Sequence, residues 1–382
     1  MASQNQPHVI VLGLGIAGSS IAATLARHDF RVTAIEQFSP LHERGSSHGD
    51  TRIFRRVPHE GEAYVQMAGA SFHGWQEWNR LAREELFVPC GGIDAGPEDS
   101  PLVRAAEELC LTHEQPFTML SGATFNRQHP RFKLPADWRV VYQPASGIVR
   151  PDATRSFLHG MARAHGATLL FDTPALAIEL LQTSARVRTA NETLDCDYLI
   201  VSAGSWLPKL LPDLAFPVTA ERRVLAWFEP FAAEDLCDGR MPIFCLDADG
   251  GWYGMPTPDG MVKVGHDKHL RQRINPDQAT IEPDAQDAAA LSPCVERYLS
   301  GFHAQPSAMK ACIYTISTDH HFLIDRHPDS DRVLIFSCCS GHGFKYAPAY
   351  GEIAADLIAG NPRPELDIFR LARGEVAVTR FA

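Results

Sequence analysis

The hydrophobic pattern begins with a short apolar run at residues 8–12, which predicts a buried β-strand. Apolar positions then recur at helical spacing from about residue 16 to residue 28, and a second apolar run at 31–35 ends at Glu36. Gly13, Gly15 and Gly18 stand where the first run passes into the helical pattern. The segment therefore predicts a strand, a glycine turn, an amphipathic helix and a second strand.

The middle of the chain repeats this order once. Helical patterns near residues 64–85 and 105–112 lie on either side of a β-like stretch at 87–94. Residues 147–172 again predict strand, turn, helix and strand, with Pro151 and Asp152 at the start of the helix.

The second half of the chain shows a different pattern. A buried strand within 197–206 ends in Ala203 and Gly204, where backbone can approach a cofactor closely. Apolar and polar residues alternate from about 218 to 315, which is typical of antiparallel sheet, and the mixed pattern resumes at Phe322.

These patterns predict an α/β protein with a discontinuous plan. We assign residues 1–86, 147–217 and 318–382 to a Rossmann-like dinucleotide domain. Residues 87–146 and 218–317 form a β-rich substrate domain of antiparallel sheet with helices. Such interruption is more typical of FAD-binding oxidoreductases than of simple NAD dehydrogenases.

Composition limits the class of partner. The 382 residues are 45% hydrophobic and 21% charged, as in ordinary globular proteins, and the formal charge is 35 − 46 = −11. This acidic balance argues against nucleic acid or an anionic membrane as a partner. No apolar run reaches the roughly 18 residues of a membrane helix, and the polar N-terminus does not resemble a signal peptide. The ending TRFA is not a peroxisomal tripeptide, so we expect a cytoplasmic protein.

The cysteines are scattered and lack metal-ligand spacing, so we expect reduced thiols and no metal. They are Cys90, Cys110, Cys196, Cys237, Cys245, Cys294, Cys312, Cys338 and Cys339.

The glycine turn carries the first candidate chemistry. Gly13 permits the tight turn, Gly15 lets backbone approach a pyrophosphate, and Gly18 allows close helix packing. The helix N-terminus favours the phosphates, and Glu36 is placed to accept hydrogen bonds from the adenosine ribose. The motif predicts a dinucleotide without distinguishing NAD from FAD.

Three further segments, in order, carry a family resemblance: GSSHGDTRIFR (45–55), ACIYTISTDHHFLID (311–325) and SGHGFKYAPAYGEIAADL (340–357). With the glycine turn, they resemble the monomeric sarcosine oxidase and N-methyltryptophan oxidase family of covalent flavoproteins, nearly end to end. The resemblance implies an architecture of the D-amino acid oxidase and glutathione reductase type with bound FAD.

The resemblance assigns roles to individual residues. Cys312 matches the cysteine that forms a thioether with the flavin, although a buried core cysteine is the simpler alternative. Arg55 and Lys345 match the pair that holds the substrate carboxylate, which two converging cations suit. Lys263 matches the lysine that promotes the reaction with oxygen, because a cation stabilises forming superoxide; the alternative is a solvated strand lysine.

The remaining matched residues lie around the flavin or the substrate. Arg52 can stabilise negative charge on the reduced ring. His342 is placed near the ring, with a packing role as the alternative, and Tyr253 and Tyr314 line the substrate cavity or belong to the core. The cofactor contacts expected besides Cys312, Arg52 and Lys345 are Gly13, Gly15, Ile16, Ala17, Gly18, Glu36, Gln37, Ser46, His48, Thr51, Ala203, Gly204, Gly341, Gly343 and Phe344.

Three positions depart from the family pattern. Ser47 replaces a histidine, Pro58 replaces a tyrosine, and Asp267 stands where an active-site histidine is expected, with His266 one position early. Strand alternation turns His266 to the opposite face from Asp267 unless a bulge resets it; we nevertheless count His266 among the candidate substrate contacts. These departures predict a substrate bulkier or more polar than sarcosine.

We therefore expect a monomeric oxidase of a secondary amino acid that passes a hydride to FAD and uses O2 as acceptor, releasing an imine and hydrogen peroxide. Other enzyme classes stay open. A noncovalent oxidase of glycine or a D-amino acid would not need Cys312. A dehydrogenase with a partner protein as acceptor would not need Lys263. A flavin-binding module without catalysis would lack the complete pair Arg55 and Lys345, and a tRNA-modifying enzyme would want a basic face.

Overall fold

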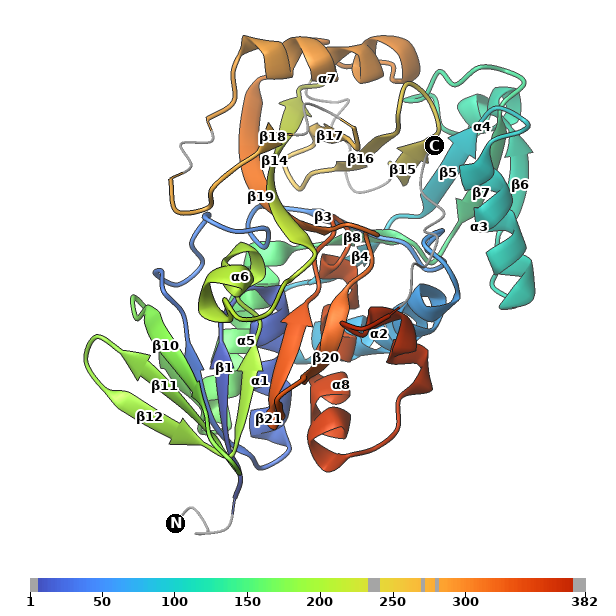
Figure 1. Ribbon diagram of the computed structural model, residues 1–382. Helices are drawn as coiled ribbons and strands as arrows, with labels where there is room; N and C mark the ends of the chain where they lie inside the picture. Colours follow the sequence, from blue (N-terminus) through green and yellow to red (C-terminus); the bar gives the residue numbers. More distant parts are fainter. Residues whose placement is uncertain (1–5, 233–240, 269–271, 279–281, 374–382) are drawn as a thin grey trace.

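A largely parallel six-stranded sheet forms one half of the molecule (Figure 1). The protein is described from a computed structural model that covers residues 6–232, 241–268, 272–278 and 282–373. The strand order is β20-β21-β13-β1-β2-β9, and only the β20–β21 pair is antiparallel. The strands are β1 (His8–Leu12), β2 (Arg31–Ile35), β9 (Thr168–Leu170), β13 (Tyr198–Val201), β20 (Leu323–His327) and β21 (Ser330–Ser337).

Both faces of this sheet are covered, so every residue of β1 is buried. One face carries α1 (Ile16–Arg27), which packs against α5 (Pro151–Ala164) and α8 (Ala347–Ala359), with α2 (Glu62–Leu81) beside α8. The other face packs against a three-stranded sheet and the short helix α6. Their bounds are β10 (Ala175–Leu180), β11 (Ala185–Thr189), β12 (Thr193–Cys196) and α6 (Leu207–Leu210).

A nine-stranded, mainly antiparallel sheet forms the other half, with α7 (Ala285–Tyr298) packed on it. Its strands are β5 (Gly92–Gly96), β6 (Thr118–Ser121), β7 (Arg139–Gln143), β14 (Val218–Phe228), β15 (Ile243–Leu246), β16 (Trp252–Pro256), β17 (Val262–His266), β18 (Gln272–Arg273) and β19 (Ala308–Ser317). Helices α3 (Pro101–Thr112) and α4 (Gly122–Gln128) lie near β5 to β7.

A small sheet of β3 (Arg52–Phe54), β8 (Gly147–Val149) and β4 (Phe87–Pro89) lies between the two large sheets (Figure 1). The α/β class expected from the sequence is confirmed. The predicted domain boundaries stay a prediction; in the small sheet β8 pairs with β3 and with β4, which were assigned to different domains.

Two local predictions need correction. The β-like stretch at 87–94 is two strands in different sheets, because the chain turns at Gly91, whose φ is +78°. The region in which alternation predicted antiparallel sheet, about 218–315, also contains α7, a helix that the pattern did not locate; its N-terminus carries a capping box of Asp284 and Asp287. Acids three positions apart before an apolar run are a helix-start signal, which the alternation around them concealed.

The approach of β1 to α1 is the tightest part of the dinucleotide turn. Gly13 has φ +91°, and a Cβ on it would lie 2.7 Å from the Ser202 carbonyl oxygen. A Cβ on Gly18 would lie 1.8 Å from the Gly13 carbonyl oxygen. Glycine is therefore required at both positions for the helix to begin directly above the strand ends.

We predict that Gly18→Ala lowers stability by about 2 kcal/mol or more and removes most of the bound dinucleotide, because the turn must open to admit the methyl group. Thermal unfolding and cofactor absorbance per chain measure both effects. Gly160→Ala in α5 is the matched control, since its new Cβ meets nothing within 4 Å and is expected to be neutral or stabilising. Wild-type cofactor content in Gly18→Ala would refute the prediction.

Candidate active site

A cavity of about 400 Å³ opens at the carboxyl ends of β1, β2 and β13 and extends to β16, β19 and the turn before α8. Such crevices beyond the strand ends are where open parallel sheets bind ligands. The predicted residues that line it are Gly13, Gly15, Ile16, Ala17, Glu36, Gln37, Ser46, Arg52, Arg55, Ala203, Gly204, Tyr253, Tyr314, Gly341, His342, Gly343, Phe344 and Lys345. Gly18, His48, Thr51, Lys263, His266 and Cys312 are not among the lining residues.

One end of the cavity has the features of a dinucleotide site. The Glu36 carboxylate accepts hydrogen bonds from the backbone N–H groups of Leu14, at 2.8 Å, and Phe38, at 3.1 Å. Burial alone would raise the pKa of Glu36, but His42 and these N–H groups lower it, so the acid stays ionised. Gly13 and Gly15 line the cavity here, and neither has a side chain to obstruct a pyrophosphate. This end therefore fits the adenosine and phosphate parts of FAD.

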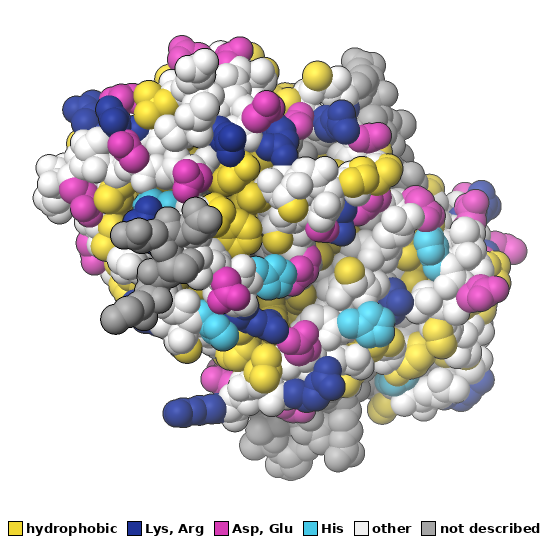
Figure 2. Space-filling model, turned by 90° about the horizontal axis from the view of Figure 1, so that it is seen from below, with side chains coloured by type: hydrophobic (Ala, Val, Ile, Leu, Met, Phe, Trp, Pro, Cys, Tyr) yellow, Lys and Arg dark blue, Asp and Glu magenta, His cyan; other side chains and the backbone are white. Residues whose placement is uncertain are grey.

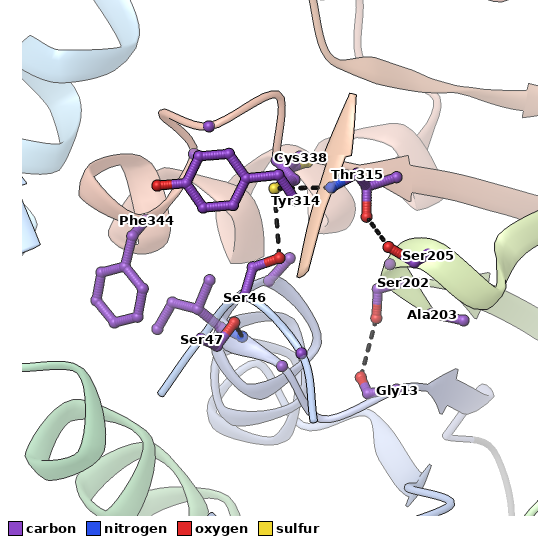
Figure 3. A pocket seen from close by; sticks show the side chains of 18 of the residues that line it. Gly13, Ser46, Ser47, Ser202, Ala203, Ser205, Tyr314, Thr315, Cys338 and Phe344 are labelled. Atoms are coloured by element: carbon purple, nitrogen blue, oxygen red, sulfur yellow. Dashed lines mark hydrogen bonds between the residues drawn. The ribbon is translucent and has the colours of Figure 1, made fainter. Parts of the chain in front are cut away.

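Serines from separate segments hold this end together (Figure 3). Ser202 Oγ donates to the Gly13 carbonyl at 3.0 Å, and Ser205 and Thr315 join their hydroxyls at 2.8 Å. Ser47 Oγ accepts the N–H of Ile16 at 3.0 Å, at the first turn of α1. Ser47, which stands where the family pattern has a histidine, thus lies at the end of the cavity that fits the dinucleotide.

Arg52 brings a cation to the cavity wall, and Lys263 lies behind that wall, next to the same loop. The Arg52 guanidinium donates to the carbonyls of Thr51, at 2.9 Å, and His48, at 2.7 Å, while it lines the cavity. Lys263 is fully buried; its Nζ donates to Asp50 Oδ1 at 2.5 Å and to the Thr51 carbonyl at 2.6 Å. Burial, and then Arg52, lower the pKa of Lys263 to about 8, against the pull of Asp50.

Cys312 lies on β19, buried beside these cations. Burial raises the pKa of its thiol to about 11, while Arg52 and Lys263 act in the opposite direction. Tyr314, two residues along the same strand, lines the cavity, as does Cys339, whose Sγ accepts the Thr315 N–H at 3.4 Å. Cys339 therefore lies in the cavity wall, and Cys312 lies behind it, near enough for the two thiols to influence each other.

Arg55 and Lys345 meet at the other end of the cavity, around a carboxylate. Arg55 donates to Glu60 at 2.9 Å and to Asp94 at 3.1 Å, and Lys345 Nζ donates to Glu60 at 3.2 Å. All four side chains are buried. Burial would raise the pKa of Glu60, but Arg55 and Lys345 hold it well below its usual value. Two segments almost 300 positions apart thus share one ion-pair cluster.

Aromatic side chains line the adjoining space. The hydroxyls of Tyr253 and Tyr314 lie 3.3 Å apart, and burial raises the pKa of Tyr253 to about 12, so it stays protonated. His342 lines the cavity with its ring stacked on Phe322, 4.8 Å between centroids, which supports a packing role.

Asp267, and not His266, lies in the cavity wall. His266 instead lies against Trp252, 4.2 Å between ring centroids, and its Nε2 is 2.9 Å from the Asp249 carbonyl oxygen. The two residues face opposite ways because they alternate at the end of β17.

The sequence analysis did not predict four residues that contact the candidate site residues. They are Asp50, which binds Lys263, and His59, Glu60 and Asp94, which contact Arg55. Asp94 had a visible signal, since an acid inside an apolar strand requires a partner. Glu60 had none, because its partners come from separate segments of the chain.

Across the described ranges, no group of three or more His, Cys, Asp or Glu side chains could hold a metal ion. The eight cysteines in those ranges are free thiols, and Cys237 lies outside them. None of the described helices is both long and apolar enough to span a membrane. Basic and acidic side chains are interspersed on the face seen in Figure 2.

Relatives with known activities share almost the whole chain. It is 31% identical over 373 residues to "Monomeric sarcosine oxidase" of Bacillus sp. (strain B-0618), covering 96% of this chain and 95% of that protein. It is also 31% identical over 378 residues to "N-methyl-L-tryptophan oxidase" of Yersinia pestis (strain Pestoides F), covering 96% and 98%.

Solved structures share the fold. NikD, described as an unusual amino acid oxidase essential for nikkomycin biosynthesis, superposes with a TM-score of 0.83 at 19% identity, covering 97% of this chain and all (100%) of that one. L-proline dehydrogenase from P. horikoshii superposes with a TM-score of 0.80 at 19% identity, covering 96% of each chain.

The family described as "FAD dependent oxidoreductase" matches residues 8–357, which include every element of the cavity. The chain belongs to this FAD-dependent oxidoreductase family and resembles the oxidases of N-methyl amino acids within it.

Proposed function

We propose that the protein is an FAD-dependent oxidase of N-substituted amino acids, which forms an imine and reduces O2 to hydrogen peroxide. The observation that carries this proposal is the convergence of Arg55 and Lys345 at one end of a cavity whose other end holds the glycine turn and Glu36. Two buried cations suit a carboxylate. The names of the relatives supply the N-methyl amino acid as substrate class.

The chain's own residues would divide the work by position. FAD, when bound, supplies the acceptor for the two electrons of the substrate. Gly13, Gly15 and Glu36 would hold its adenosine end, and Arg52 would place positive charge beside its ring. Arg55 and Lys345 would orient the substrate carboxylate, and the aromatic wall would exclude water from the reacting carbon.

The expected substrate is bulkier or more polar than sarcosine. Asp267 brings an acid into the cavity wall, and His59, directly after Pro58, also lines the cavity. Of the three departures, Asp267 therefore lies in the cavity wall near Tyr253, Pro58 lies beside a lining residue, and Ser47 contacts the first turn of α1. The monomeric state and cytoplasmic location expected from the sequence stay predictions.

One observation keeps the noncovalent oxidase as a second candidate. Cys312 lies behind the cavity wall with a thiol that burial keeps protonated, and a thioether requires that sulfur to reach the ring. A noncovalent enzyme would bind the same carboxylates at Arg55 and Lys345.

We predict that denaturing gels of the purified protein show flavin fluorescence on the chain, and that Cys312→Ser abolishes it. Cys339→Ser is the matched control, because this second thiol lines the same cavity. It should keep the fluorescence. Fluorescence lost in Cys339→Ser instead, or absent from the wild type, would contradict the tether at Cys312.

We predict that Lys263→Met slows the reaction of the reduced enzyme with oxygen by about 10²-fold or more, while anaerobic reduction by substrate changes much less. The pKa of Lys263, lowered to about 8, also sets a pH dependence. Its cation is present below that pKa, so the oxygen reaction should slow as pH rises through about 8. Stopped-flow absorbance separates the two half-reactions. Equal losses in both would show that Lys263 is only structural.

A further inference from the structure

The carboxylate clamp, defined as Arg55, Lys345, Glu60 and Asp94, is electrically balanced before any substrate binds. Its two cations and two anions sum to +2 − 2 = 0 when the neighbouring imidazoles of His59, beside Asp94, and His342, beside Glu60, are counted as neutral. The substrate carboxylate assigned to it under the proposed function would bring the buried cluster to −1. Because isolated charge is costly in a buried site, a ligand that also carries a positive group would bind better.

Two polar atoms of the clamp are buried without a hydrogen-bond partner among the described residues. Arg55 Nε is a donor, and Glu60 Oε2 is an acceptor. Lys345 Nζ has used two of its three N–H donors, on Glu60 and on the His342 carbonyl. Native structures rarely leave such atoms unsatisfied, so each one indicates a missing partner.

The unsatisfied atoms match the two charged groups of an amino acid. Arg55 Nε and the remaining Lys345 N–H need an acceptor, which a carboxylate provides. Glu60 Oε2 needs a donor, which an ammonium group provides. In an α-amino acid both groups are attached to the same carbon, so they lie close together. Glu60 likewise lies beside both cations, 2.9 Å from Arg55 and 3.2 Å from Lys345.

We propose that Glu60 is a substrate-binding residue that receives the substrate's charged amino group, so that the enzyme selects its substrate as the zwitterion. This inference rests on the proposed function and adds the protonation state in which the substrate binds. Asp94 balances charge without this contact. It contacts Arg55 but does not line the cavity, and its Oδ2 accepts a hydrogen bond from Gln143 at 3.1 Å.

The test compares two unreactive ligands of one shape on the flavin-loaded enzyme. 2-Aminoisobutyrate has no hydrogen on its α-carbon, and pivalate replaces its ammonium group by a methyl group. Calorimetry gives the ratio of their dissociation constants. The wild type should prefer 2-aminoisobutyrate, and Glu60→Gln should reduce that preference by about 10- to 100-fold. Asp94→Asn should keep most of it, although it removes the same charge.

An unchanged preference in Glu60→Gln, or an equal loss in Asp94→Asn, would overturn the role of Glu60. If Glu60→Gln fails to fold, Glu60→Asp keeps the charge but withdraws the oxygen, and an unchanged preference in it would also overturn the proposal. Because both probes are unreactive, absence of oxidase activity does not obscure the result. If N-alkyl amino acids reduce the flavin of the wild type but it shows no preference between the probes, only the role of Glu60 is overturned. If N-alkyl amino acids do not reduce the flavin and neither probe binds, the proposed function is overturned as well.

Discussion

The burial of Arg55 and Lys345 is the constraint on which the site depends. A cation removed from water is strongly destabilising unless anions and hydrogen bonds replace its hydration. Here Glu60 bridges both cations and Asp94 holds Arg55 from the other side. The same burial lowers the pKa of Lys345 to about 8, so the bridging carboxylate also keeps that side chain cationic near neutral pH. The cluster is held by ion pairs on both sides of Arg55, and the proposed ligand would repeat its charge pattern.

The fold brings these groups together because the chain passes several times between its two large sheets. Arg55 follows β3, Asp94 lies on β5, and Lys345 lies in the 3-10 turn Phe344–Tyr346. The turn is held in place because Trp75 of α2 donates to the Lys345 carbonyl at 2.8 Å. One cavity is therefore lined by residues of both large sheets. The proposed cofactor and substrate sites would lie at its two ends, and the proposed reaction would occur between them.

The elements that depend on local sequence pattern could be predicted from the sequence. Apolar runs and the glycine turn predicted β1, α1 and β2, and the glycines beside Lys345 predicted the close approach before α8. Helix α7 was missed because alternation dominated the surrounding region. The partners of the clamp could not be predicted, because Glu60 contacts Lys345 across 285 positions and no periodicity encodes such a pair. Asp267 lines the cavity and His266 does not, as strand alternation alone would have predicted, although we had kept His266 as a candidate substrate contact.

The most direct test of this account is anaerobic reduction of the flavin-loaded protein, monitored by flavin absorbance, followed by admission of oxygen and assay of peroxide. The account predicts that N-alkyl amino acids bleach the flavin, that the matched amines without a carboxylate do not, and that each substrate consumed yields one peroxide. Bleaching that is independent of the carboxylate, or reduced enzyme that does not react with oxygen, would contradict the central claim that this cavity is an amino acid oxidase site.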